Sequence, residues 1–159
     1  STPHVLLPLP ASPHEAAAHA QQRIDTEQLD QWLDEQLRHQ SRGILVVEPA
    51  GGLHVPITEE FLTSDWCARR QEPLVLVARS GLGTLNHTML TLESLAARNL
   101  APTALILVGP VHDSNRTTLM KRVSCPVIEL PPLRPLTEET LRTWALTSGL
   151  REALQPLIL

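Results

Sequence analysis

The pattern of hydrophobic positions along the chain changes near residue 43. Before that point, a proline-rich opening leads to a short alanine-rich stretch at residues 14–20, and leucine and tryptophan then recur at helical spacing over residues 25–40. Side chains three and four residues apart share one face of a helix, so we expect two helices here. Ser12, followed by Pro13, and Asp25 stand where these helices would begin, and both residue types cap helix N-termini.

After residue 43 the hydrophobic residues form short, continuous runs. Four such runs are rich in valine, isoleucine and leucine: residues 43–48, 74–78, 104–108 and 126–130. Runs of this kind are typical of parallel strands that are buried on both faces. Helical stretches lie between them: residues 65–70, 84–98 and 114–123. With a helical tail from Thr137 onward, the alternation predicts a single α/β domain over residues 1–159, a parallel sheet flanked by helices.

Composition excludes several classes of protein. The 159 residues carry a net charge of −4 and scattered basic residues, which argues against a nucleic-acid partner because such a surface needs a basic stripe. Cys67 and Cys125 match no metal-site spacing and favour a reduced chain. The apolar runs are far shorter than the ~20 residues of a membrane span, and the opening residues show no signal-peptide pattern. We therefore expect a cytoplasmic protein with no membrane partner.

Glycines gather in the loops that follow the predicted strands, where ligands bind in parallel sheets. Glu48 ends the first apolar run, and Gly51 and Gly52 follow it. A carboxylate at this position either ligates Mg²⁺ near phosphates or forms a solvated strand end. The glycine pair either brings the backbone close to a ligand or forms a plain turn.

The loop after the second run has a richer sequence, Gly-Leu-Gly-Thr-Leu-Asn-His at residues 81–87. It joins a strand to a helix that is predicted to begin near Thr84. A helix start leaves N–H groups without acceptors and carries a partial positive charge, so it suits a carboxylate or a phosphate. Asn86 and His87 add side-chain donors, although a single histidine is more often a structural hydrogen-bonding group. The third glycine of a dinucleotide fingerprint is missing.

No catalytic residue emerges from the sequence. The chain has one lysine, Lys121, which follows Met120, whereas a P-loop requires glycines that wrap the phosphates and a lysine that neutralises them. A Gly-x-Ser-x-Gly sequence is absent, and neither cysteine stands in a glycine-rich turn. The sequence therefore contains neither a P-loop for nucleotide phosphates nor a motif for a catalytic nucleophile.

Several segments together resemble the dethiobiotin synthetases of biotin biosynthesis. They are residues 12–17, 48–56 (Glu-Pro-Ala-Gly-Gly-Leu-His-Val-Pro), 76–88 (Leu-Val-Ala-Arg-Ser-Gly-Leu-Gly-Thr-Leu-Asn-His-Thr), 109–116 (Gly-Pro-Val-His-Asp-Ser-Asn-Arg) and 129–132 (Glu-Leu-Pro-Pro). The resemblance covers nearly the whole chain, and residues 81–87 are its most specific part. It implies a P-loop-NTPase-like fold without the P-loop strand and helix, which this chain does not contain.

The family closes a ureido ring on 7,8-diaminononanoate, a small diamino carboxylate, using CO₂, ATP and Mg²⁺. The resemblance implies that Glu48 is a Mg²⁺ ligand and that Gly51 and Gly52 lie along the substrate. The family's two lysines, one in the P-loop and one that assists carbamate formation, are missing from this chain together with the P-loop, which is a departure from the family pattern.

The resemblance also assigns the helix start. Thr84, Leu85 and Asn86 would hold the distal carboxylate of the substrate, reaching across a dimer interface into the site of the partner. This agrees with the anion site that the residues themselves predict.

A third group, Val108, Pro131 and Leu133, would contact the adenine.

Two residues of this chain depart from the family pattern at the predicted metal and adenine sites. Pro49 replaces the usual glycine after the metal glutamate and removes an N–H. Val108 stands where many members carry an asparagine that reads the adenine, and valine cannot make that hydrogen bond.

Three functions remain open at this point. In the first, the chain is the substrate-binding and dimerisation part of a dethiobiotin synthetase, an ATP-dependent ligase when complemented by a P-loop segment, as a homodimer or as a heteromer with a P-loop-bearing chain. In the second, it is a catalytically inactive relative that acts as a partner or regulatory subunit of an active synthetase. In the third, it is a different enzyme on the same scaffold that binds a dicarboxylate or an amino acid without ATP.

Overall fold

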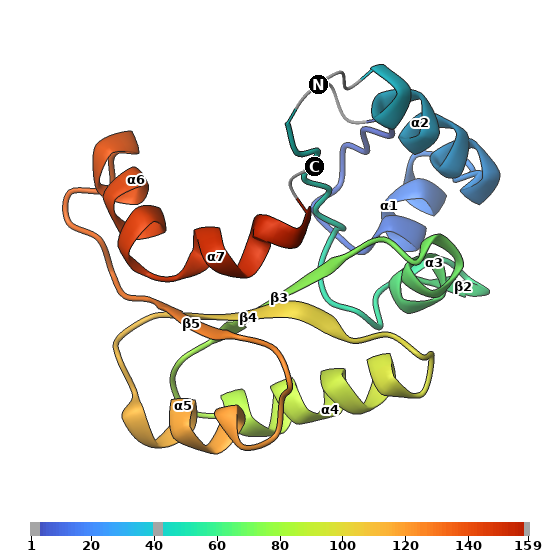
Figure 1. The fold of residues 1–159 in the computed structure, drawn as a ribbon. Helices are drawn as coiled ribbons and strands as arrows, with labels where there is room; N and C mark the ends of the chain where they lie inside the picture. Colours follow the sequence, from blue (N-terminus) through green and yellow to red (C-terminus); the bar gives the residue numbers. More distant parts are fainter. Residues whose placement is uncertain (1–3, 40–42, 158–159) are drawn as a thin grey trace. The chain divides into compact units, whose positions relative to one another are not determined.

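The chain divides into two compact units, Ser1–Gln71 and Glu72–Leu159 (Figure 1). The computed structural model describes residues 4–39 and 43–157. Within these ranges, no helix combines the length and the apolar character that crossing a membrane requires. The single domain over residues 1–159 stays a prediction.

The first unit begins with two helices. Its elements are α1 (Pro13–His19), α2 (Thr26–His39), β1 (Pro56–Thr58), β2 (Phe61–Leu62) and α3 (Thr63–Arg70). Ser12 occupies the capping position of α1, but its side chain makes no cap hydrogen bond. Asp25 does cap α2, because its Oδ1 accepts the N–H groups of Glu27 at 2.9 Å and Gln28 at 3.2 Å. The predicted end of this helix at residue 40 lies outside the described residues.

The core of the first unit joins elements that are far apart in sequence. Its buried members are Ala17, Ile24, Leu33, Ile57 and Trp66. The indole N–H of Trp66 donates to Asp30 Oδ1 at 2.8 Å, and Arg69 pairs with the other oxygen of Asp30 at 2.8 Å. Asp30 thus connects α2 to α3 through a neutral donor and a cation.

The strand predicted at residues 43–48 is wrong. Among the described residues, this segment forms no strand and pairs with none, and the side chain of Val46 is 83% exposed. A strand needs a neighbour that satisfies its backbone N–H and C=O groups. The apolar composition of residues 43–48 favours a buried strand, but composition does not show whether a second strand is present to pair with it.

The second unit confirms the parallel sheet. Its elements are β3 (Leu74–Arg79), α4 (Thr84–Ala96), β4 (Pro102–Val108), α5 (Asp113–Met120), β5 (Val127–Leu130), α6 (Glu138–Thr147), α7 (Leu150–Leu154) and a 3₁₀ turn (Gln155–Leu157). The strands run parallel in the order β3-β4-β5. The predicted start of the tail is also confirmed, since Thr137 Oγ1 accepts the N–H of Thr140 and caps α6.

Helices cover both faces of this sheet. Figure 1 shows α4 and α5 on one face and α6 and α7 on the other. The buried core between the sheet and the α4–α5 layer consists of Leu105, Leu107 and Leu119, and Leu85 and Met89 of α4 pack against it. The helical connections after β3 and β4 therefore bring the carboxyl ends of the three strands, with their loops, to one edge of the sheet.

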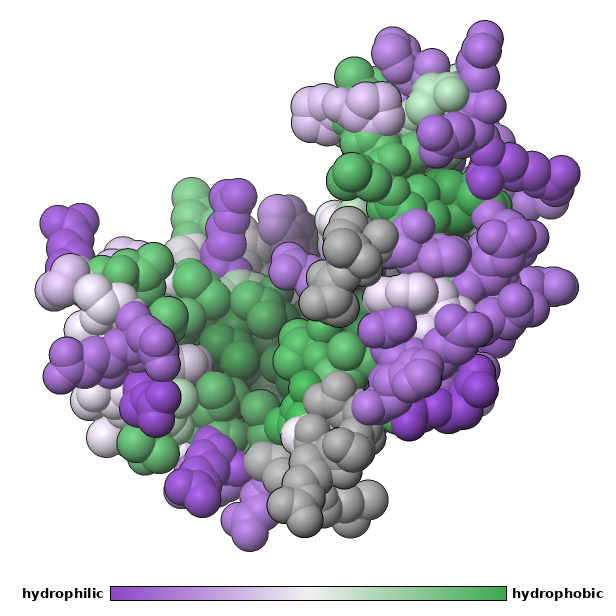
Figure 2. Space-filling view, turned by 90° about the horizontal axis from the view of Figure 1, so that it is seen from above, coloured by the Kyte–Doolittle hydropathy of each residue, from purple (hydrophilic) through white to green (hydrophobic). Residues whose placement is uncertain are grey.

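β3 is an edge strand with the composition of an interior strand. In the described sheet it is hydrogen-bonded to β4 alone, and Val77 is 61% exposed. Natural edge strands usually carry lysine, proline or other devices that prevent further pairing, whereas β3 is apolar from Leu74 to Ala78. The surface view shows apolar side chains gathered into broad areas rather than dispersed among polar ones (Figure 2). The free edge of β3 is thus suited to another strand.

Candidate functional site

The loop between β3 and α4 presents a helix start without a side-chain cap. Gly83 occupies the N-cap position with φ +89°, a left-handed conformation that favours glycine. The N–H of Thr84 donates to Gly81 O at 3.2 Å. An α-helix leaves its first N–H groups without intrahelical acceptors, and here these include those of Leu85 and Asn86.

The side chains at this helix start face different environments. Thr84 is buried, and its Oγ1 lies 3.3 Å from Thr88 Oγ1. Leu85 packs against the leucine core of the second unit, so what it can offer a ligand is its N–H rather than its side chain. Asn86 and His87 are exposed. Of the three residues predicted to hold the distal carboxylate, only Asn86 therefore has an accessible side chain.

A cavity of about 340 Å³ adjoins the helix start. One wall is apolar and comes from residues 76–78 of β3, and the other is polar and comes from Thr84, His87, Thr88 and Thr91 of α4. Arg79, exposed at the end of β3, also lines it. The cavity thus combines a guanidinium, hydroxyl groups and a hydrocarbon surface, which suits a ligand with an aliphatic chain and an anionic group.

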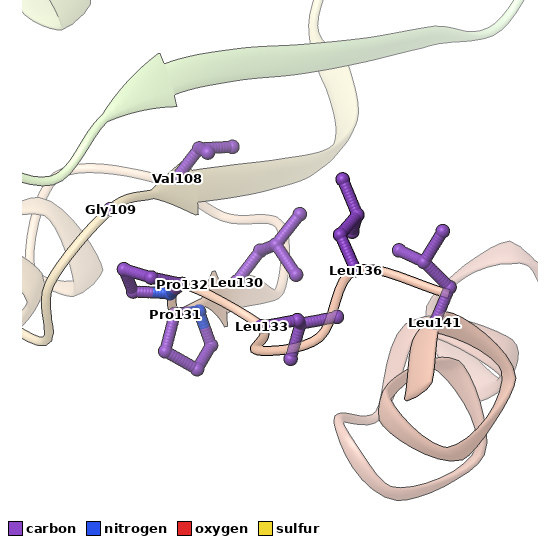
Figure 3. A pocket seen from close by; sticks show the side chains of 8 residues that line it. All are labelled: Val108, Gly109, Leu130, Pro131, Pro132, Leu133, Leu136 and Leu141. Atoms are coloured by element: carbon purple, nitrogen blue, oxygen red, sulfur yellow. The ribbon is translucent and has the colours of Figure 1, made fainter. Parts of the chain in front are cut away.

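A second cavity, of about 360 Å³, lies at the ends of β4 and β5. All three residues predicted to contact adenine, Val108, Pro131 and Leu133, line it. Figure 3 shows Val108 and Leu130 approaching from the strands, while other leucines come from α6 and the segment that leads into it. This lining is almost wholly apolar and fits the face of a flat ring, but the side chain of Val108 offers no hydrogen bond to the edge of that ring.

The glycine loop of the first unit is tightly folded. Gly51 has φ +86°, and a Cβ added there would lie 2.8 Å from Val55 Cγ2, so this position requires glycine. The N–H of Val55 donates to Gly52 O at 3.0 Å and closes the turn. Glu48 is exposed just before this loop.

The fit of Mg²⁺ to Glu48 depends on how many ligands the protein must supply. Within the described residues, no group of three or more histidine, cysteine, aspartate or glutamate side chains could hold a metal ion. Mg²⁺ usually keeps several waters and takes one or two carboxylates together with phosphate oxygens. A single accessible carboxylate fits that mode, so Glu48 stays the candidate ligand.

Both thiols are poorly suited to nucleophilic chemistry. Burial raises the pKa of Cys67 and that of Cys125 above the ordinary value for a thiol. The thiolate is the reactive form, so a raised pKa lowers the reactive fraction at neutral pH. This agrees with the absence of a nucleophile motif in the sequence.

The comparisons with known proteins identify the family. A family model described as an AAA domain matches residues 1–140. The ATP-dependent dethiobiotin synthetase BioD of Paramagnetospirillum magneticum is 40% identical over 138 residues, which cover 86% of this chain and 64% of that protein. The chain belongs to the dethiobiotin synthetase family. BioD of Afipia carboxidovorans is 38% identical over 144 residues, 90% of this chain and 66% of its own length.

Membership in the dethiobiotin synthetase family confirms the resemblance and the P-loop-NTPase-like α/β class. A further relative, the biotin biosynthesis bifunctional protein BioCD of Bordetella avium, is 44% identical over 102 residues, 64% of this chain and 22% of that protein. The chain spans about two thirds of the length of the BioD relatives named above. That this dethiobiotin synthetase relative lacks a P-loop stays a prediction.

The structure of this dethiobiotin synthetase relative reveals three residues near the helix start to which sequence reasoning gave no role. Ser80, Gly109 and Asn115 lie in the loops after β3 and β4 and in the first turn of α5. All three stand within or beside the segments that carry the family resemblance, but their mutual contacts have no signature in the linear sequence. Three of the predicted site residues, Glu48, Gly51 and Gly52, belong to the first unit. The remaining predicted substrate-binding and adenine-binding residues belong to the second unit.

Proposed function

We propose that the protein forms part of a dethiobiotin synthetase of biotin biosynthesis. This enzyme is an ATP-dependent ligase that closes a ureido ring on 7,8-diaminononanoate with CO₂, and the present chain supplies its substrate-binding and dimerisation part. The names of the relatives and their coverage support this assignment. The structural observation that carries it is the uncapped start of α4 beside a half-apolar cavity.

The helix start binds the distal carboxylate of the substrate. The N-terminus of an α-helix carries roughly half a positive charge, and its free N–H groups point at an anion placed there. Leu85 and Asn86 provide N–H groups, and the amide of Asn86 adds a donor. In the proposed homodimer, this helix start serves the site of the partner, while the apolar wall formed by residues 76–78 accommodates the aliphatic chain of the substrate.

The nucleotide is bound by a different part of the chain. The apolar cavity at Val108, Pro131 and Leu133 receives the adenine. Glu48 contributes one carboxylate oxygen to Mg²⁺. The backbone at Gly51 and Gly52 lies along the substrate. ATP and Mg²⁺, when bound, supply the phosphoryl-transfer chemistry. The residues of this chain orient the substrate and the base.

A P-loop-bearing segment completes the assembly, either upstream in the same protein or on another chain. The free apolar edge of β3 and the unpaired apolar run at residues 43–48 support this part of the proposal, because each is suited to a neighbouring strand.

Both thiols are unpaired, which agrees with action in the reducing cytoplasm.

The test is a calorimetric titration of the purified chain with diaminononanoate and, separately, with ATP·Mg²⁺. We expect binding of the diamino acid without nucleotide, and carbamate-dependent release of ADP once a P-loop segment from a relative is added. The expected loss of affinity for Asn86→Ala is about 10- to 150-fold, since a hydrogen bond to a charged group contributes about 1.5–3 kcal/mol. The same substitution at Gln155, far along the chain in the final 3₁₀ turn, serves as the control.

A correctly assembled complex that releases no ADP would contradict the enzymatic proposal. The inactive-subunit alternative is favoured by one observation, the apolar Val108 in the cavity that would receive the adenine. In that case the chain binds neither ligand by itself and instead changes the activity of a co-purified synthetase.

A further inference from the structure

Asn115 connects α5 to the loop that precedes the helix start of α4. Its Nδ2 donates to Ser80 O at 2.8 Å and to Gly81 O at 3.4 Å. The backbone N–H of Asn115 donates to Nδ1 of His112, the N-cap residue of α5, at 3.3 Å. The backbone of Asn115 is thus fixed in the first turn of α5, and its side-chain amide binds two consecutive carbonyls of the β3–α4 loop.

Ser80 is fixed from the other side as well. It is 2% exposed, its N–H donates to Val108 O at 3.0 Å, and its Oγ donates to Pro110 O at 2.7 Å. Gly109 lies directly against it, since a Cβ at Gly109 would come within 2.6 Å of Ser80 Oγ. The base of the loop is thus tied to the loop that follows β4.

The orientation of these carbonyls determines the orientation of the next N–H groups. A trans peptide is planar, and its N–H points opposite to its C=O. Because Asn115 binds the carbonyls of Ser80 and Gly81, the N–H groups of Gly81 and Leu82 point away from α5. The bond from Thr84 N to Gly81 O then sets the first turn of α4 relative to the same peptide.

We propose that Asn115 is a positioning residue for the carboxylate-binding helix start, acting through the carbonyls of Ser80 and Gly81. This inference rests on the proposed function of that helix start and adds a residue to which the family resemblance assigned no role. The loop has two glycines, which lose more conformational freedom on ordering than other residues do. Asn115 holds the loop in one conformation before the substrate arrives, so less of the binding energy is spent on ordering it.

The experiment compares diaminononanoate with its methyl ester, in which the terminal carboxylate is replaced by an uncharged ester group that carries one extra methyl. Calorimetry on the purified chain gives the preference of the native protein for the acid over the ester. We expect Asn115→Ala to reduce this preference about tenfold and to leave the affinity for the ester unchanged, which corresponds to about 1.4 kcal/mol. Thr118→Ala is the matched control, because Thr118 lies on the same helix and its Oγ1 donates to Ser114 O rather than to the loop.

The outcomes separate this inference from the proposed function. Equal loss of affinity for acid and ester in Asn115→Ala, or an unchanged preference, overturns the positioning role while the proposed function stands. A native chain that binds the acid no better than the ester overturns the proposed function, and this inference with it. Asn115→Leu, which removes the donors but retains the volume and stays uncharged, gives the same readout if the alanine variant does not fold.

Discussion

Replacing Gly109 with alanine is expected to lower the free energy of unfolding by about 2–4 kcal/mol. Gly109 has φ +131°, a conformation that side chains rarely adopt, and the new Cβ would lie 2.6 Å from Ser80 Oγ. Ser80 cannot move aside without cost, because it is buried and both its N–H and its hydroxyl are hydrogen-bonded. Urea unfolding followed by circular dichroism measures the change.

Gly81→Ala is the control for this prediction. A Cβ at Gly81 meets no atom within 4 Å, and its φ is not in the left-handed range, so the expected change is within about 0.5 kcal/mol. Both glycines belong to loops at the same edge of the sheet, which makes the pair a test of local geometry rather than of loop position. If the two variants unfold at the same urea concentration, the close packing of Gly109 against Ser80 contributes little to the free energy of unfolding.

The alternation of elements in the second unit could be predicted because its strands are mainly apolar and its loops are rich in glycine and proline. The strand predicted at residues 74–78 is Leu74–Arg79, and the helix predicted at 84–98 is Thr84–Ala96. In the first unit, the same composition at residues 43–48 predicts a strand that is not formed. A strand is defined by its neighbour as much as by its own residues, and a linear pattern contains no information on whether that neighbour is present.

The grouping of the candidate site residues could also be predicted in part. Val108 ends β4 and Pro131 follows the adjacent parallel strand β5, and the carboxyl ends of such strands meet at one edge of a sheet. The orientation of individual side chains could not be predicted in this way. Leu85 belongs to the helix start by sequence, yet its side chain packs into the core. The contact of Asn115 with Ser80 joins residues 35 apart and depends on how two loops and a helix pack.

Leu119→Ala is expected to destabilise the second unit by about 3–5 kcal/mol. Leu119 of α5 is completely buried and forms the leucine core with Leu105 and Leu107, against which Leu85 also packs. The substitution loses the transfer free energy of the removed atoms and adds the cost of a cavity, because close-packed surroundings relax only in part. The midpoint of urea unfolding, followed by circular dichroism, measures the effect.

The comparison variant is Leu90→Ala, which makes the same chemical change on α4 of the same layer, at a side chain that is 56% exposed. Its expected effect is below about 1 kcal/mol, since little apolar surface is removed from the interior. The leucine core also fixes the backbone of the helix start, because Leu85 packs into it. Leu119→Ala should therefore raise amide hydrogen exchange over residues 84–88 as well, and Leu90→Ala should not. Equal destabilisation of the two variants would contradict the role of this core in stability, and unchanged exchange over residues 84–88 in Leu119→Ala would show that the core does not hold the helix start in place.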